Sequence, residues 1–299
     1  MITSKTIKQL AKKIGFSDCG ISDITVSDEY YNKFTNWLSI GYNAEMYYLQ
    51  NHQNIRKNPQ LLVENAKSVI SVIFNYYSIE TPDDISITIS KFALGKDYHK
   101  ILKKKLLDLF SELKKICSEI NGRVFVDTAP LFERYFAAKA GLGFIGKNNC
   151  LINETYGSWI FIGEIIVDVE LEYDKPLNQN CDSCKKCIVS CPTKALTENC
   201  LDANKCISYH TVENKSEIPP EIKDKITTQI FGCDICQNVC PYNVKAIQNN
   251  NTELKILPQI KGLNYHNLVS QSKDRFKNTF SETSISRISY EKLLSNFFK

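Results

Sequence analysis

The sequence lacks the features that would direct the chain into a membrane or out of the cell. Its longest apolar run, at residues 68–74, is far too short to cross a bilayer as a helix. Residues 1–5 lead into a polar amphipathic pattern, without the apolar core of a signal peptide and without a twin arginine. We therefore expect a cytoplasmic protein with no membrane partner.

A strong charge bias is absent as well. The net charge of +4 neither requires nor excludes a nucleic acid as partner. With 43% hydrophobic and 23% charged residues, the composition is typical of folded globular proteins and argues against long disordered segments. At 299 residues the chain is longer than one average domain, so two domains are expected.

Cysteine, in contrast, is abundant, with 12 residues. Because we find no secretory signal, the thiols should stay reduced, which argues against a disulfide scaffold. Cys181, Cys184, Cys187 and Cys191, followed by Pro192, form the C-x2-C-x2-C-x3-C-P pattern of bacterial 4Fe-4S ferredoxins. In that pattern the fourth cysteine serves a second cluster, so a second cysteine motif is expected downstream.

The second motif is incomplete and consists of Cys233, Cys236 and Cys240. Ile230 stands where a further cysteine is expected, and its side chain cannot bind iron, so Cys206 is the best candidate for the missing ligand. Two four-cysteine zinc sites are the alternative, but zinc ribbons keep their C-x2-C pairs apart and need no crossover. We assign one 4Fe-4S cluster to Cys181, Cys184, Cys187 and Cys240, and the other to Cys191, Cys206, Cys233 and Cys236.

Apolar periodicity predicts alternating helices and strands over the first 170 residues or so. Helical spacing followed by glycine favours helices, and short β-branched runs favour buried strands. The predicted helices are at residues 3–14, 98–120 and 131–140, and the predicted strands at residues 68–74, 85–94, 123–127 and 160–169.

These patterns predict a fold of the α+β or α/β class. We expect an α/β catalytic domain at residues 1–175, a ferredoxin-like domain with two 4Fe-4S clusters at 176–246, and a short helical C-terminal extension at 247–299. The helix predicted at 98–120 carries a lysine-rich polar face, which is the usual pattern of a solvated surface and, less often, of a phosphate-binding one.

Asp127 is the first candidate for chemistry outside the cysteine motifs. It ends a predicted strand, and active groups in α/β sheets tend to lie at the carboxyl ends of strands. The alternative is that it caps the next turn, a common role for Asp before a helix. Residues 141–150 contain three glycines that would let backbone approach a ligand, but they follow a helix and so lack the context of a dinucleotide-binding loop.

The sequence resembles the epoxyqueuosine reductase family. The resemblance lies in Val-Asp-Thr-Ala-Pro at 126–130, Glu-Arg at 133–134, the glycine-rich stretch at 140–148, Gly-Ser-Trp at 157–159 and the cysteine arrangement, and it spans roughly residues 5–295. It implies an oxidoreductase that converts epoxyqueuosine at the wobble position of tRNA to queuosine, the last step of queuosine biosynthesis. The implied cofactors are two 4Fe-4S clusters and cobalamin, reduced to cob(I)alamin through the clusters and bound between them and the α/β domain.

The resemblance also implies roles for individual residues. Asp127 would donate a proton to the epoxide oxygen, which at neutral pH requires a raised pKa, and burial over an apolar corrin face would raise it. The cobalamin contacts implied by the same correspondence are Arg56, Tyr98, Asp127, Lys147, Asn148, Ser158, Ser208 and Asp234.

A histidine ligand to cobalt is not expected. Asp97, Tyr98 and His99 begin like the D-x-H-x2-G motif of proteins that bind cobalt through histidine, but Leu102 stands at the glycine position.

The expected partners are tRNA and an external electron donor, and we expect a monomer. Longer family members continue into helical HEAT-like repeats that help to grip tRNA, whereas this sequence ends shortly after Leu293, so the affinity for tRNA would be weaker or would come from other surfaces. The basic candidates for phosphate contacts, which are otherwise a solvated basic tail, are Lys273, Arg275, Lys277, Arg287 and Lys292.

Three other functions are alternatives to this one. A corrinoid-dependent reductive dehalogenase-like oxidoreductase would share the cofactors, but respiratory members usually carry a twin-arginine signal and use a tyrosine as proton donor. A plain iron-sulfur electron-transfer protein would leave the long α/β domain without a role, and bound cobalt would argue against it. A tRNA-binding protein with purely structural clusters is the third alternative.

Overall fold

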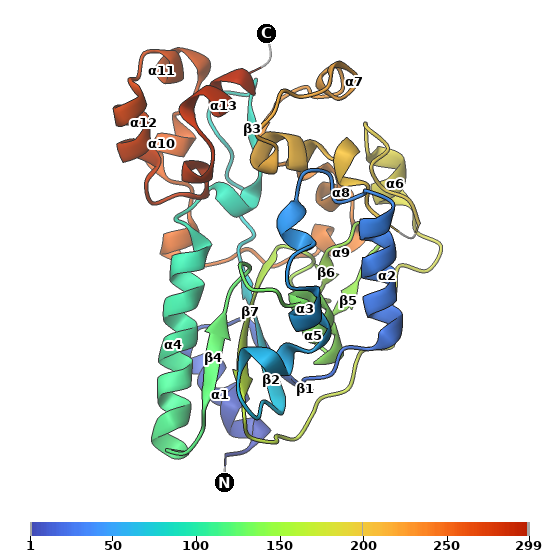
Figure 1. Ribbon diagram of the computed structural model, residues 1–299. Coiled ribbons are helices and arrows are strands. Elements are labelled where there is room, and N and C mark those ends of the chain that lie inside the picture. Colours follow the sequence, from blue (N-terminus) through green and yellow to red (C-terminus); the bar gives the residue numbers. More distant parts are fainter. Residues whose placement is uncertain (1, 199, 298–299) are drawn as a thin grey trace.

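The computed structural model describes residues 2–198 and 200–297 (Figure 1). Its largest sheet has four strands in the order β1-β2-β7-β4, and every neighbouring pair is antiparallel. The α+β alternative of the predicted class therefore applies to this sheet. The four strands are β1 (Asp18–Asp23), β2 (Ser68–Asn75), β7 (Ile160–Val167) and β4 (Gly122–Phe125).

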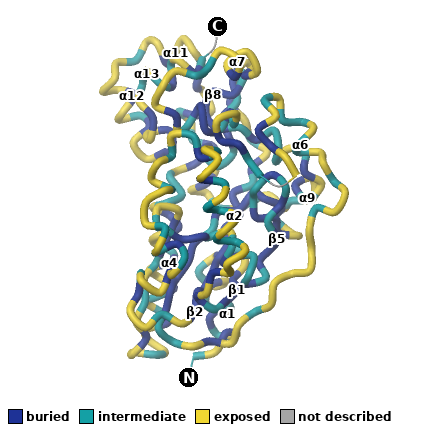
Figure 2. The backbone as a smooth tube through the Cα atoms, turned by 45° about the vertical axis from the view of Figure 1, so that its right-hand side comes forward, coloured by how far each residue is buried: buried dark blue, intermediate teal, exposed yellow. Residues whose placement is uncertain are grey.

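Helices cover both faces of this sheet, so its central strands are buried on both sides, as Figure 2 shows for β2. Apolar residues of β2 and β7 accordingly form near-continuous runs rather than alternating with polar ones. The helices on one face are α1 (Ser4–Ile14) and α4 (Tyr98–Ile116), and those on the other are α2 (Asp28–Ser39) and α5 (Glu133–Lys139).

Helix α4 lies on the sheet through a leucine stripe. Leu102, Leu106, Leu109 and Leu113 recur every three or four residues, and each is 0% exposed. Gly163 of β7 makes room for them, since a Cβ there would lie 2.9 Å from Leu106 Cδ1. The close approach brings the first turn of α4 to the end of the sheet where β4 ends.

Two predicted elements are shorter in the structure. Helix α4 ends at Ile116 rather than at residue 120, because Cys117 adopts an extended conformation (φ −136°, ψ 90°). Of the strand predicted at 85–94, only β3 (Thr88–Ile89) forms, because its neighbour in a two-stranded parallel sheet, β8 (Gln229–Phe231), is itself short. The predicted helix at 3–14 and the predicted strand at 68–74 agree with α1 and β2 to within a residue.

The remaining segments are short. Between the elements of the main sheet lie η1 (Tyr47–Leu49), α3 (Gln53–Lys57), η2 (Pro59–Leu62), η3 (Lys91–Ala93), β5 (Phe144–Ile145) and β6 (Leu151–Ile152). The cysteine-rich segment contains α6 (Lys186–Ser190), η4 (Ala203–Lys205), the π-helix η5 (Tyr209–Glu213), α7 (Pro220–Lys223), α8 (Ile235–Asn238) and α9 (Pro241–Val244). After it come η6 (Thr252–Leu254), α10 (Pro258–Lys261), α11 (Tyr265–Val269), α12 (Lys273–Phe280), η7 (Ser284–Arg287) and α13 (Tyr290–Ser295).

The C-terminal helices pack with β3 and β8 around a second apolar core, which includes Phe231, Ile260, Phe280 and Leu293. Asn296 fastens this group to the cysteine-rich segment, because its buried side-chain amide donates to the carbonyl oxygens of Thr211 (3.0 Å) and Ile230 (2.9 Å). In Figure 1 these helices lie at the end of the molecule away from the N-terminus.

Residues 175–180, at the predicted boundary between the first two domains, are exposed throughout. The predicted domain boundaries stay predictions, and residues 298–299 of the predicted extension lie outside the described part of the chain. No helix within residues 2–198 and 200–297 has the length and apolar character needed to cross a bilayer.

Candidate active site and cluster sites

A cleft of about 1700 Å³ opens between the main sheet, the cysteine-rich segment and the C-terminal helices. Its walls come from α2, the loop that joins β4 to α5, the glycine-rich loop, residues 198, 200–201 and 212–215, and residues 287–292. Of the residues predicted for catalysis and cobalamin binding, three line this cleft: Arg56, Asp127 and Lys147.

Asp127 directly follows β4 and lies on the cleft wall. Its backbone has a left-handed conformation (φ 57°), which aspartate adopts more readily than most residues. Its backbone N–H donates to the Glu133 carboxyl group. Helix α5 begins after Phe132 without any side-chain cap, so Asp127 does not cap it, and its carboxyl group is left for other contacts.

The Asp127 carboxyl group meets three side chains from other elements. Oδ2 accepts a hydrogen bond from the Tyr98 hydroxyl (3.0 Å) and lies 2.9 Å from His99 Nε2. Arg287 Nη1 is 3.8 Å from the same oxygen. The side chain of Asp127 is nevertheless 46% exposed and therefore accessible from the cleft.

The protonation of Asp127 differs from the sequence-based expectation. Burial alone would raise the pKa of this carboxyl group, but the hydrogen bonds from His99 and Tyr98 and the charge of Arg287 outweigh burial and lower the pKa below its ordinary value. The expected rise is therefore wrong for this structure. Asp127 is ionised at neutral pH and must acquire a proton before it can donate one.

His99 belongs to the first turn of α4 and lies between two carboxylates. Its Nδ1 is 2.6 Å from Asp97 Oδ1, while its Nε2 faces Asp127. Its side chain is 15% exposed. Sequence reasoning noticed this Asp-Tyr-His triplet but tested it only as a cobalt-binding motif, and so missed the contact with Asp127.

Glu133 and Glu164 are two further acids beneath Asp127. Burial, and next the negative charge of Asp127, raise the pKa of Glu133 to about 8. Glu164, in the middle of β7, is 0% exposed, and burial together with the charge of Glu133 raises its pKa well above the ordinary value. Ser71 donates to one of its oxygens (3.1 Å), and the other has no protein partner.

Arg56 and Tyr98, two of the predicted cobalamin contacts, are held by aromatic rings. The Arg56 guanidinium lies 5.7 Å from the centre of the Phe34 ring and 5.9 Å from that of Phe132, and its buried Nε has no partner. The Tyr98 ring stacks on Phe161 at 4.0 Å. Arg56 thus offers an unused donor to a polar group in the cleft.

Ser158 and Asp234 lie where the cysteine-rich segment meets the main sheet. Ser158 Oγ donates to Gln237 (2.8 Å) and accepts from Asn243 (2.9 Å). Asp234 accepts hydrogen bonds from the Ser90 hydroxyl and from the Lys91 backbone N–H (2.8 Å). Both predicted cobalamin contacts therefore already join the two parts of the chain.

The other predicted contacts lie nearer to the cysteines. Lys147 Nζ donates to the Asp182 carbonyl oxygen (2.8 Å). Asn148 is buried and lines the pocket of the first cysteine set, and its Nδ2 has no partner. Ser208 is half-buried and directly precedes the π-helix η5.

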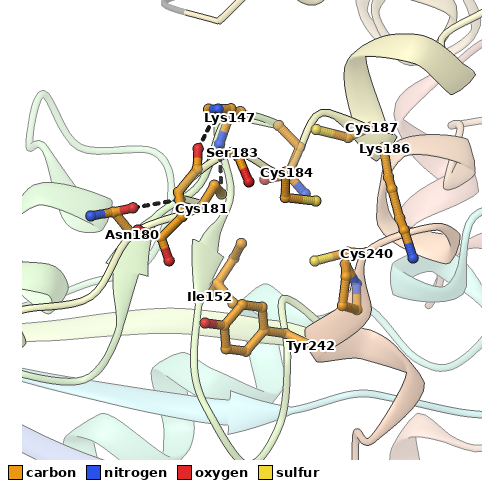
Figure 3. Close-up of a pocket in the computed structure, with 13 residues that line it drawn as sticks. Lys147, Ile152, Asn180, Cys181, Ser183, Cys184, Lys186, Cys187, Cys240 and Tyr242 are labelled. Atoms are coloured by element: carbon orange, nitrogen blue, oxygen red, sulfur yellow. Dashed lines mark hydrogen bonds between the residues drawn. The ribbon is translucent and has the colours of Figure 1, made fainter.

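The first cysteine set surrounds one pocket of about 260 Å³, shown in Figure 3. It is lined by Cys181, Cys184 and Cys187 of the first motif and by Cys240 of the second. The sulfur atoms of Cys184, Cys187 and Cys240 point toward a shared space in Figure 3. Within residues 2–198 and 200–297, no group of three or more Cys, His, Asp or Glu side chains is arranged to hold a single metal ion.

The second cysteine set consists of four half-buried residues, Cys191, Cys206, Cys233 and Cys236. Burial raises the pKa of Cys233 to about 12, and the charges of Cys206 and Cys191 act in the same direction. Burial likewise raises the pKa of Cys236, with contributions from Cys233 and Cys206. The four cysteines assigned to the second cluster therefore lie near one another, although Cys206 comes from outside both motifs.

Two of the five basic candidates for tRNA contacts line the cleft, namely Arg287 and Lys292. Lys273 instead pairs with Glu291. The cleft has five further basic side chains that the sequence did not indicate as tRNA contacts, because they come from distant segments: Lys33, Arg56, Arg134, Lys147 and Lys215.

Comparison with known proteins matches two parts of the chain to family profiles. Residues 56–128 match "Epoxyqueuosine reductase QueG, DUF1730", and residues 180–243 match "4Fe-4S double cluster binding domain".

Curated relatives extend the match over nearly the whole chain. An epoxyqueuosine reductase of Leadbetterella byssophila is 42% identical over 293 residues, which cover 98% of this chain and 96% of the relative. The epoxyqueuosine reductase of Escherichia coli (strain K12) is 34% identical over 300 residues, covering 98% of this chain and 79% of the relative. Some relatives thus have nearly the length of this chain, while others are longer.

Solved structures are similar as well. An epoxyqueuosine reductase with an epoxyqueuosine-modified tRNA-Tyr stem loop has a TM-score of 0.90 at 30% identity, covering 98% of this chain and 79% of that one. An epoxyqueuosine reductase of Bacillus subtilis, with its catalytic aspartate loop swung out of the active site, has a TM-score of 0.89 at 29% identity, with 98% and 79% covered.

Proposed function

The chain belongs to the epoxyqueuosine reductase family, and from this premise we propose how its cleft reduces epoxyqueuosine to queuosine at the wobble position of tRNA. The observation that carries the proposal is an accessible carboxyl group, Asp127, on the wall of a large cleft beside a segment for two 4Fe-4S clusters. Family membership decides against a dehalogenase and against a plain electron-transfer protein.

The segment at residues 180–243 binds the two 4Fe-4S clusters. The ligand sets we propose are those assigned from the sequence, with Cys240 crossing to the first cluster and Cys191 to the second. The pocket lined by Cys181, Cys184, Cys187 and Cys240 supports the first set. Beyond burial, the charges of Cys206 and Cys191 raise the pKa of Cys233, and the charge of Cys191 raises that of Cys206, which supports the second set.

Cobalamin is the second cofactor we propose, and the residues present fit it. The cleft exceeds the 300–1000 Å³ range that is usual for small-molecule pockets, which leaves room for a corrinoid together with a nucleotide. Arg56, on the cleft wall, has a buried Nε donor without a partner, suited to the amide carbonyls around a corrin ring, while the unpartnered Nδ2 of Asn148 belongs to the pocket of the first cysteine set. When bound, cobalamin supplies a strongly reducing cobalt centre that delivers electrons to the epoxide.

Asp127 is the residue we propose as proton donor to the epoxide oxygen. Tyr98 and His99 orient its carboxyl group, and Glu133 holds its backbone N–H. The Bacillus relative, whose catalytic aspartate loop is swung out, supports a loop that moves between positions. The low pKa of Asp127 means that a proton must reach it from a neighbouring group or from solvent.

The remaining proposals concern partners and compartment. Basic side chains on the cleft wall, among them Lys215, Arg287 and Lys292, are suited to phosphates of the anticodon loop. A tRNA substrate favours the cytoplasm as the compartment. An external one-electron donor would reduce the clusters, and we propose a monomer.

The experiment that tests the function uses anaerobically purified protein with both clusters and added cobalamin. It is incubated with a reductant and epoxyqueuosine-containing tRNA, and the digested nucleosides are analysed by mass spectrometry. Queuosine is expected, and its absence with cobalamin-loaded protein would overturn the assignment.

Asp127→Asn tests the proton donor. Asparagine keeps the size of the side chain but cannot deliver a proton, so cobalamin should still bind while the turnover rate falls by about 10²- to 10⁴-fold. The cobalamin absorption spectrum checks binding, and the rate of queuosine formation checks turnover. Full activity of the variant would remove Asp127 from this role.

A further inference from the structure

The reaction needs more protons than Asp127 can deliver at once. Converting an epoxide to an alkene consumes two electrons and two protons and releases one water molecule. One proton goes to the epoxide oxygen as the first C–O bond breaks, and the second goes to the resulting hydroxyl group as it leaves as water and the C=C bond forms. A single carboxyl group supplies one proton, so it must be reloaded within a turnover.

Three side chains form a hydrogen-bonded series that suits such reloading, in the order Asp97, His99 and Asp127. His99 Nδ1 lies 2.6 Å from Asp97 Oδ1, and His99 Nε2 lies 2.9 Å from Asp127 Oδ2. The two ring nitrogens therefore connect a partly buried carboxylate to the one that faces the cleft. Asp97 is itself fixed, because its backbone N–H donates to the Glu282 carbonyl oxygen (2.7 Å).

We propose that His99, oriented by Asp97, transfers a proton from Nε2 to the Asp127 carboxylate and so reloads it during turnover. This inference rests on the proposed function. His99 acts through Asp127 and does not touch the epoxide. The transfer converts an imidazolium and a carboxylate into a neutral imidazole and a carboxylic acid, and solvent then returns the proton to His99.

Arg287 can stabilise the His99 imidazole after its proton has left. Its Nη2 lies 2.7 Å from His99 Nε2. When Nε2 carries a proton, it donates to Asp127, and once that proton has left, the bare nitrogen can accept a hydrogen bond from Arg287. Asp97 accepts from Nδ1–H in both states, so the ring stays in place while its charge changes.

The charged groups around His99 support a protonated resting state. Burial alone would lower the pKa of the imidazole, but the hydrogen bonds with Asp127 and Asp97 outweigh burial and raise it, while Arg287 acts against them. Glu133, from α5, also faces this cluster and is sensitive to the charge of His99. The raised pKa favours the protonated imidazole of His99, which can still release its proton.

His99→Gln tests the inference in the complete enzyme with both clusters and cobalamin. Glutamine can hydrogen-bond at this place but cannot carry a proton, so kcat should fall by about 10²-fold or more while KM stays unchanged. The cluster and cobalamin absorption spectra should match those of the wild type. The control is His266→Gln, an exposed histidine on α11, which should leave kcat unchanged.

Asp97→Asn provides a second variant and a readout that does not depend on turnover. Removing the negative charge should lower the pKa of His99, measured by histidine-selective ¹⁵N NMR titration of the protein with oxidised clusters. Activity needs protonated His99 and is lost as pH rises through the pKa of His99, so the falling limb of the pH–kcat profile should shift to lower pH in this variant. His99→Ala should recover part of its activity when imidazole is added.

The outcomes separate this inference from the proposed function. If the wild type forms no queuosine, the proposed function itself is wrong. If the wild type is active and His99→Gln has the same kcat and pH profile, only the role of His99 is wrong. A falling limb that does not move in Asp97→Asn, although NMR shows a lowered His99 pKa, would also overturn the proposal.

Discussion

Glu133 holds the Asp127 backbone through a carboxyl group that is neutral over most of the physiological range. Burial and the charge of Asp127 raise its pKa to about 8, whereas the pKa of an unperturbed glutamate is about 4. Between these values the folded chain binds a proton that the unfolded chain has released. Stability from this group is therefore complete at low pH and falls as pH rises toward about 8.

Glu133→Gln should remove this loss, because glutamine keeps the acceptor for the Asp127 N–H and cannot ionise. We expect the melting temperatures of variant and wild type to differ least at low pH, and the variant to melt a few degrees higher near pH 8, at roughly 2–4 °C per kcal/mol. Anaerobic thermal unfolding at a series of pH values measures this. Glu64→Gln, at an exposed position, is the control, and a Glu133→Gln difference independent of pH would contradict the prediction.

At the scale of single residues, the sequence was most informative where spacing along the chain carries the chemistry. The cysteine motifs and the strand-ending Asp127 could be selected because their neighbours in sequence define them. The sequence could not indicate the partners of Asp127, because they belong to three different segments that meet at its carboxyl group and backbone only after folding: His99, Glu133 and Arg287. The low pKa of Asp127 has the same origin, because its cause lies in those contacts.

At the scale of elements, the turn at Asn153 and Gly157 joins the main sheet to α9. Gly157 has a left-handed conformation (φ 60°), and a Cβ there would lie 1.9 Å from Asn243 Oδ1. That oxygen accepts a hydrogen bond from the Ser158 backbone N–H (2.6 Å). The turn therefore needs glycine both for its backbone and for the close approach of the next element.

Gly157→Ala should destabilise the protein strongly and loosen the contact with α9. Gly41→Ala is the matched control, because Gly41 is also left-handed (φ 73°) but a Cβ there meets nothing within 4 Å. The control should lose about 1–2 kcal/mol from backbone conformation alone, and Gly157→Ala clearly more. Melting temperatures of both variants check this. Equal losses of stability would contradict the prediction, because they would show that the Asn243 side chain moves aside without a loss of free energy.

Helices and strands were predicted well where they are long and periodic. The leucine stripe of α4 and the β-branched run of β2 are visible in the sequence because burial imposes a period on them. Strand β3 was predicted too long, because its extent depends on β8, which lies far along the chain. The antiparallel order of the main sheet depends on such long-range pairing too, and local patterns do not contain it.

At the scale of the whole molecule, the two clusters form the route by which electrons enter, and Cys206 is the one proposed cluster ligand that lies outside both cysteine motifs. Cys206→Ser should lower iron from about eight to about four per chain, because one cubane loses a ligand. Queuosine formation should be lost with it. Cys117→Ser, at the end of α4, is the control and should keep both iron and activity.

Iron analysis and electron paramagnetic resonance of the reduced protein measure this outcome. A Cys206→Ser protein with a full complement of iron would show that another residue completes the second cluster. A loss of all iron would instead show that the two clusters depend on each other for assembly.

The parallel pairing of β3 with β8 also has a consequence for the synthesis of the protein on the ribosome. Thr88 and Thr228, whose side-chain hydroxyls share a hydrogen bond, are 140 residues apart in the chain. At ~5–20 residues per second, a ribosome needs roughly 7–28 s to synthesise the chain between them. During that time β3 has an unpaired edge, and the second apolar core lacks most of its residues. The nascent chain must therefore be kept from aggregating until the last cysteines and the C-terminal helices have left the ribosome.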